Sequence, residues 1–294
     1  MQIENKPKEI LERRYLPPTL DIVFQRLFGR EESKEITKDF LEYILGKSIE
    51  TIDLSKTKIL ERNKPRDKQS ILDVRAEING EENCNVEMQM VDHDALIARI
   101  LFYWSKMFQG SIHKGDPYTK LKKTVSILIA NFSIKGLEEL EYHTKWKIIE
   151  EKDRIIILTD LLEIHIIELP KIQGREEEKD GLLDWLFFLK NPESERTKKG
   201  MEENEKIQDA EKELAKLKEN EELEDLEFRE WIAEMDRQAS IDTAERRGKE
   251  AGEKEKAKVV AKRLLEMKMR IQDIIQITEL TEEEIQQIKE ESKK

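Results

Sequence analysis

Residues 71–90, ILDVRAEINGEENCNVEMQM, contain the pattern that decides the fold. Asn79-Gly80 is a strong signal for a tight turn between two strands. On both sides of it apolar and polar residues alternate, which is typical of strands with one buried face. One face of the first arm carries only apolar side chains, Leu72, Val74, Ala76 and Ile78. The second arm should bury Val86, Met88 and Met90. The stretch therefore predicts a β-hairpin.

The predicted register places two carboxylates opposite each other. With the turn near Gly80, Asp73 faces Glu87, and Gln89 follows two residues later on the same face. Opposed Cβ atoms lie ~4.5–5.5 Å apart, where like charges are destabilising. Three arrangements would relieve the repulsion: a protonated carboxyl, a bridging cation such as Arg75, or a divalent metal ion with the Gln89 carbonyl as a further oxygen ligand.

A helix is predicted next, over residues 93–110. Arg99, Tyr103 and Lys106 recur at helical spacing and share one face, which suits binding of a phosphodiester backbone or is an ordinary charged surface. The opposite face is expected to pack inward through Leu96, Ile97, Ile100, Leu101 and Trp104.

The rest of the chain divides by composition. Helices are predicted over 16–29, with Thr19 as a candidate N-cap, and over 33–47 and 181–190; residues 124–134 read as a strand buried on both faces. Interleaved helices and strands indicate one α/β or α+β domain over 16–190, after a tail at 1–15. Residues 191–294 form a charged extension, expected to be solvated helices. It ends in two short helices, the second capped by Thr281 with Glu284.

Charge and composition limit the functional classes. The net charge is −12, but residues 1–130 hold 22 Lys and Arg against 21 Asp and Glu, so the acidity belongs to the second half. Cys84 is the single cysteine, which suits a reducing compartment. No run is apolar enough to span a bilayer or to serve as a signal peptide, so a cytoplasmic location without a membrane partner is expected. The four histidines are too scattered in sequence to suggest a zinc site.

Several of these segments together resemble a known family. The strand with Asp73, the Glu87-Met88-Gln89 that follows, LDIVFQRLFG at 20–29 and ARILFYWSKMFQG at 98–110 look like the recombination-promoting nuclease and transposase family, a branch of the PD-(D/E)XK nucleases. The similarity extends over about residues 16–190 and includes EIHIIELPK and GLLDWLFFLK.

The resemblance implies a central mixed sheet flanked by helices, and Mg²⁺-dependent endonuclease cleavage of DNA, with Mn²⁺ as the other candidate ion. Asp73 and Glu87 would be the metal ligands, Gln89 would stand where the motif's lysine usually lies, and Asp21 would match the acid of the family's first motif. Arg99, Tyr103 and Lys106 would bind DNA. A link to recombination or mobile elements comes from the family alone.

Two departures from the family pattern bear on activity. Leu72 stands where the family has a proline, which shapes only the backbone. Gln89 stands where the family usually has a lysine, and its neutral amide can orient a water but adds no positive charge. The competing hypothesis is a non-catalytic scaffold or interaction protein that uses its acidic helical tail, with homo-oligomers formed through the C-terminal helices.

Overall fold

The structure is a computed structural model that describes residues 14–55, 57, 74–92, 95–219, 241, 248–249, 252–253, 255–278 and 280–291. The chain divides into two compact units, residues 1–227 and 228–294. Each helix that the structure describes is too short or too polar to traverse a lipid bilayer.

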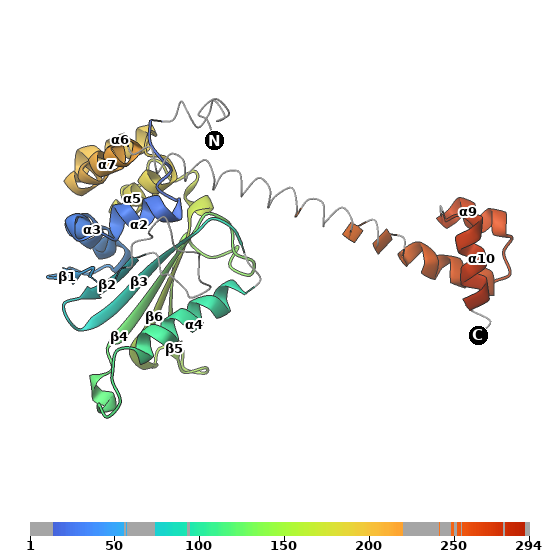
Figure 1. The fold of residues 1–294 in the computed structure, drawn as a ribbon, viewed down its shortest axis with the longest axis horizontal. Coiled ribbons are helices and arrows are strands. Elements are labelled where there is room, and N and C mark those ends of the chain that lie inside the picture. Colours follow the sequence, from blue (N-terminus) through green and yellow to red (C-terminus); the bar gives the residue numbers. More distant parts are fainter. Residues whose placement is uncertain are drawn as a thin grey trace. The chain divides into compact units, whose positions relative to one another are not determined.

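A six-stranded mixed sheet forms the centre of the first unit (Figure 1). Its order is β1-β2-β3-β4-β6-β5, antiparallel from β1 to β3, parallel from β3 through β4 to β6, and antiparallel again at β5. The strands are β1 (Ile52–Asp53), β2 (Val74–Ile78), β3 (Glu82–Gln89), β4 (Lys123–Ala130), β5 (His143–Ile149) and β6 (Ile157–Glu168). The predicted mixed α/β architecture is confirmed.

The β2–β3 hairpin has the register that the sequence predicts. Val74 pairs with Val86, and Asn79 and Gly80 both have positive φ (52° and 68°), as the central residues of a type I′ turn require. Asp73 lies outside the described residues. Met90 is a correction: it follows the end of β3 and is 38% exposed, because the alternation stops with the strand.

One face of the sheet is covered by the larger hydrophobic core. It packs against α2 (Asp21–Phe28), α3 (Lys34–Leu45), α5 (Gly181–Lys190), α6 (Glu195–Glu203) and α7 (Glu205–Lys218) (Figure 1). The fully buried Trp185 lies at its centre, within 6 Å of the rings of Phe28, Phe40 and Phe188. The candidate cap Thr19 is wrong by one residue, since Leu20 is the residue that precedes α2.

The opposite face of the sheet is covered by α4 (Leu96–Gln109) (Figure 1). Leu96 and Ile100 join a second core cluster with apolar side chains of β4 and β6. The prediction that Ile97 and Leu101 also pack inward is wrong, because they are 46% and 44% exposed. The buried stripe of α4 runs instead through Leu96, Ile100 and Met107.

The far edge of the sheet differs from the sequence interpretation. One long strand, β6, contains the second half of DRIIILTD (153–160) and most of LLEIHIIELPK (161–171). Its antiparallel neighbour β5 was not predicted. Short 3₁₀ helices complete the connections at Glu31–Ser33, Tyr118–Lys120 and Leu169–Ile172.

The charged segment after residue 190 contributes to the main core. Along α7 the side chains at one helical face are buried in it, namely Ile207, Ala210, Leu214 and Leu217. Asn204, the N-cap of α7, donates a hydrogen bond to Asp39 in α3 at 2.8 Å. The compact unit thus extends to residue 227, beyond the change in composition at residue 191.

The second unit has its own small core. Ala261, in a helix over 255–266, packs with Ile274 of α9 (Ile271–Thr278) and with Ile285 and Ile288 of α10 (Glu282–Glu291). The predicted capping box is present, because the backbone N–H of Thr281 donates to Glu284 and that of Glu284 donates to the Thr281 hydroxyl.

Candidate active site

Glu87 is the buried carboxylate of the β2–β3 hairpin. It lies near the end of β3, on the face that α4 covers, and is only 6% exposed. The neighbouring odd-numbered positions of β3 on this face are also polar: Asn83, Asn85 and Gln89. A row of polar side chains beneath an amphipathic helix is costly unless its members are hydrogen-bonded.

Two side chains hold the Glu87 carboxylate. Arg99 of α4 forms an ion pair with its Oε1 through Nη2, and Gln89 donates to the same oxygen from Nε2 at 3.1 Å. The Gln89 amide nitrogen also donates to the Met88 carbonyl at 2.8 Å. The sequence suggested a cation such as Arg75 as one way to compensate the charge of these acids. Glu87 does have a guanidinium partner, but it is Arg99 and not Arg75.

The electrostatic environment of Glu87 is that of a partly compensated buried acid. Burial raises its pKa above the ordinary value, the attraction and hydrogen bond of Arg99 lower it, and the negative charge of Asp21 raises it again. The net direction is upward, so desolvation and the second acid outweigh the single guanidinium. Asp21, the first residue of α2, therefore lies close enough for its charge to act on Glu87.

The polar face of α4 is only partly exposed to solvent. Arg99 turns toward the sheet and keeps 31% of its side chain exposed, because it pairs with Glu87. Its guanidinium also lies 5.8 Å from the centre of the Tyr103 ring, while Lys106 is exposed. The three predicted DNA-binding residues thus share one side of α4. Among them, Arg99 forms the ion pair with Glu87.

Two buried polar residues beside Glu87 were not singled out in the sequence. Ser126 of β4 donates a hydrogen bond to the Asn85 side chain at 2.7 Å, and both are almost fully buried. The polar alternation of β3 was the available signal for Asn85. Ser126 carried none, since it lies in an otherwise apolar run.

A family model described as PD-(D/E)XK nuclease family transposase matches residues 18–244. The chain belongs to this family. No curated protein and no solved structure gives a match. The PD-(D/E)XK match covers the sheet, α4 and the helices through α7, so it extends past residue 190.

Family membership supports a nuclease-like function in general and implies DNA as the substrate. PD-(D/E)XK nucleases typically use divalent metal ions. Within the described ranges no three His, Cys, Asp or Glu side chains converge as a ready-made metal site; Asp73 is outside those ranges. Glu87 and the nearby Asp21 nevertheless provide carboxylate oxygens, which suit a hard divalent cation.

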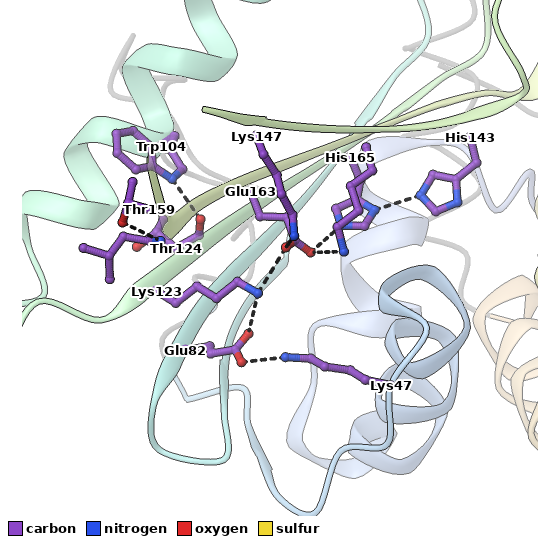
Figure 2. Close-up of polar contacts among 12 residues, drawn as sticks. Lys47, Glu82, Trp104, Lys123, Thr124, His143, Lys147, Thr159, Glu163 and His165 are labelled. Atoms are coloured by element: carbon purple, nitrogen blue, oxygen red, sulfur yellow. Dashed lines mark hydrogen bonds and ion pairs between the residues drawn. The ribbon is translucent and has the colours of Figure 1, made fainter. Parts of the chain in front are cut away.

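A second polar cluster of the protein lies at β5 and β6, on the sheet face opposite α4 (Figure 2). His143 Nε2 is 2.8 Å from His165 Nδ1, and His165 Nε2 is 2.9 Å from the Glu163 carboxylate. Although the histidines are scattered in the sequence, antiparallel pairing of β5 and β6 brings these two together.

Lysines surround the acid of this cluster. Lys123 lies between Glu163 and Glu82, at 3.1 and 3.8 Å (Figure 2). Lys145 is 2.8 Å from Glu163. Burial raises the pKa of Glu163, but hydrogen bonds from His165, Lys145 and Lys123 outweigh it and hold the pKa well below its usual range. Glu163 is thus an acceptor, so His165 carries its proton on Nε2 and accepts one from His143.

Acidification is expected to destabilise the protein through His143. Burial and the neighbouring His165 and Lys145 lower the pKa of His143 from 6.5 to about 4. The unfolded chain therefore binds a proton that the folded chain does not between these values, and stability is lost as the pH falls from about 6.5 to about 4.

Urea unfolding at a series of pH values tests this effect. His143→Gln should show a shallower loss of stability across this window than the wild type, because glutamine can still donate to His165 but does not titrate. The exposed His113→Gln is the control and should follow the wild type. Parallel profiles for the wild type and His143→Gln would contradict the prediction.

Proposed function

We propose that the protein is a metal-dependent deoxyribonuclease that hydrolyses phosphodiester bonds endonucleolytically at the site around Glu87. The observation that carries the proposal is the buried Glu87 carboxylate, which has a raised pKa, a second acid nearby and a cationic helix above it. Buried acids with perturbed pKa values are concentrated at functional sites. A link to recombination or mobile elements and a cytoplasmic location complete the proposal.

Asp73 and Glu87 would hold Mg²⁺, or Mn²⁺, with Asp21 as a third carboxylate on the same side. When bound, such an ion lowers the pKa of a coordinated water and offsets negative charge on the phosphate. A cation at Glu87 would take over part of the counter-charge that Arg99 supplies in its absence.

Gln89 is suited to orienting the attacking water. Its amide nitrogen is directed to Glu87 and to the Met88 carbonyl, which leaves the amide oxygen to accept a hydrogen bond from the water. The water oxygen would attack phosphorus in line and release a proton to solvent. The opposite phosphorus–oxygen ester bond would break, and the departing oxygen would take up a proton from solvent. The exposed Lys106 would bind a phosphate of the backbone, and Tyr103 would support Arg99 through its ring.

One observation favours the competing function, a nuclease-like scaffold without catalysis. Glu87 already has a guanidinium partner, and Gln89 provides no positive charge where the usual motif has lysine. In that case the acidic C-terminal helices would bind a partner or a second copy of the chain, and the site around Glu87 would be only structural.

Nicking of supercoiled plasmid separates the two functions. The wild type should convert plasmid to open circles with Mg²⁺ and not with EDTA, and Asp73→Ala should remove this activity. Glu77→Gln is a matched control, because Glu77 lies on the same hairpin but pairs with Lys122 at 2.8 Å. Equal nicking by the wild type and Asp73→Ala would exclude catalysis at this site.

A further inference from the structure

α4 exposes an aromatic ring beside the candidate active site. Phe102 is 55% exposed, more than Ile97 or Leu101 on the same helix. An exposed phenylalanine is not unusual by itself, because much of any protein surface is apolar. Its neighbours are what distinguish it.

A continuous series of contacts leads from Glu87 to this ring. Arg99 pairs with Glu87 and lies 5.8 Å from the centre of the Tyr103 ring. The Tyr103 and Phe102 ring centres are 5.7 Å apart, and the Lys106 ammonium lies 5.5 Å from the centre of the Phe102 ring. Two adjacent aromatic rings therefore lie between two cations, from the buried acid outward to solvent.

We propose that Phe102, Tyr103 and Lys106 form a binding site for an unpaired nucleobase next to the cleaved phosphate, so that the preferred substrate is single-stranded DNA. The proposal rests on the nuclease function proposed above and adds the class of substrate. Phe102 would stack on the face of the base, while Lys106 would bind the adjoining phosphate.

The chemistry of the surface favours an unpaired base over an intact duplex. Bases in a duplex have both faces covered by their neighbours, so a protein ring gains nothing from them unless the base is unstacked. Single-stranded DNA offers free faces, and proteins that bind it combine aromatic rings with cations. The Phe102 ring and the Lys106 ammonium provide this combination within one helical turn.

Binding to a short oligothymidylate that contains one 2-aminopurine tests the proposal. The strand is titrated with full-length protein in EDTA, which prevents metal-dependent cleavage. Quenching of the 2-aminopurine fluorescence reports stacking of the base. The wild type should bind this strand more tightly than its duplex, with strong quenching. Phe102→Ala should weaken single-strand binding about 5- to 150-fold and remove the quenching, while duplex binding stays unchanged. Phe102→Trp should keep both properties.

Ile97→Ala is the matched control, since Ile97 is 46% exposed on the same helix but lies about 140° around its axis from Phe102. It should bind like the wild type. Unchanged binding by Phe102→Ala, equal losses for single strand and duplex, or no binding by the wild type would overturn the proposal. The readout needs no catalysis, so a protein that binds and quenches but never cleaves would refute the nuclease function and show a binding site for single-stranded DNA without cleavage.

Discussion

Replacing Glu87 by glutamine is expected to reduce Mg²⁺-dependent plasmid nicking by at least about a hundredfold without lowering the melting temperature of the protein. The loss follows from removal of the charge that the proposed metal ion needs. Glutamine keeps an oxygen to accept hydrogen bonds from Arg99 and Gln89, so the local geometry should remain.

The stability of this variant follows from the direction of the Glu87 pKa. Because the pKa is raised in the folded protein, the folded chain binds more protons than the unfolded chain as the pH rises past the ordinary carboxyl value. Ionised Glu87 therefore reduces stability at neutral pH, and this reduction is absent below the unfolded pKa. Glu87→Gln should remove that part of the pH dependence.

Nicking and thermal unfolding should be measured on the same preparations, with Glu77→Gln as the control. Glu77 shares the hairpin face but pairs with Lys122, so its variant should nick at the wild-type rate. A Glu87→Gln protein that nicks like the wild type would show that this carboxylate does not act in catalysis. A large fall in melting temperature would show instead that the ion pair with Arg99 is needed for folding.

Shortening the chain to residue 190 is expected to prevent folding, whereas a chain that ends at residue 227 should fold. The shorter chain lacks α6 and α7, and with them Ile207, Leu214 and Leu217 of the main core. Burial of three such side chains contributes about 5–9 kcal/mol. That is comparable to the whole stability of a typical domain, about 5–15 kcal/mol.

Polar contacts that would be lost add to this effect. Asp39 accepts hydrogen bonds from Trp185 and from Asn204, and the second donor lies beyond residue 190. Asp184 of α5 forms a buried ion pair with Arg196 of α6. Its pKa is raised by burial and lowered by Arg196, so removal of Arg196 would leave a buried acid without its cation.

Circular dichroism and urea unfolding of the two shortened chains test the prediction. The chain ending at 227 should unfold in one cooperative transition, and the chain ending at 190 should be unfolded or aggregated. A cooperative transition for the shorter chain would mean that the sheet with α2, α3, α4 and α5 is a domain by itself. The full chain serves as the reference for the helical signal of the second unit.

The sequence predicted the elements with strong local patterns. The twofold alternation around Asn79-Gly80 determined the hairpin and its register, and the continuous apolar run at 124–134 predicted the buried strand β4. β5 was missed because its residues are mostly exposed and follow no clear alternation. The burial of α7 was missed because its few apolar residues are separated by many charges.

For the candidate site, the sequence by itself determined that Glu87 and Gln89 share a face of β3, because side chains of a strand alternate at every residue. Only the tertiary structure decided that Arg99 turns inward to pair with Glu87 and that the charge of Asp21 reaches it. It also brought His143 to His165 and α7 to the core. The physical reason is range: alternation and turn signals act between near neighbours in the chain, whereas these contacts depend on how whole helices and strands pack.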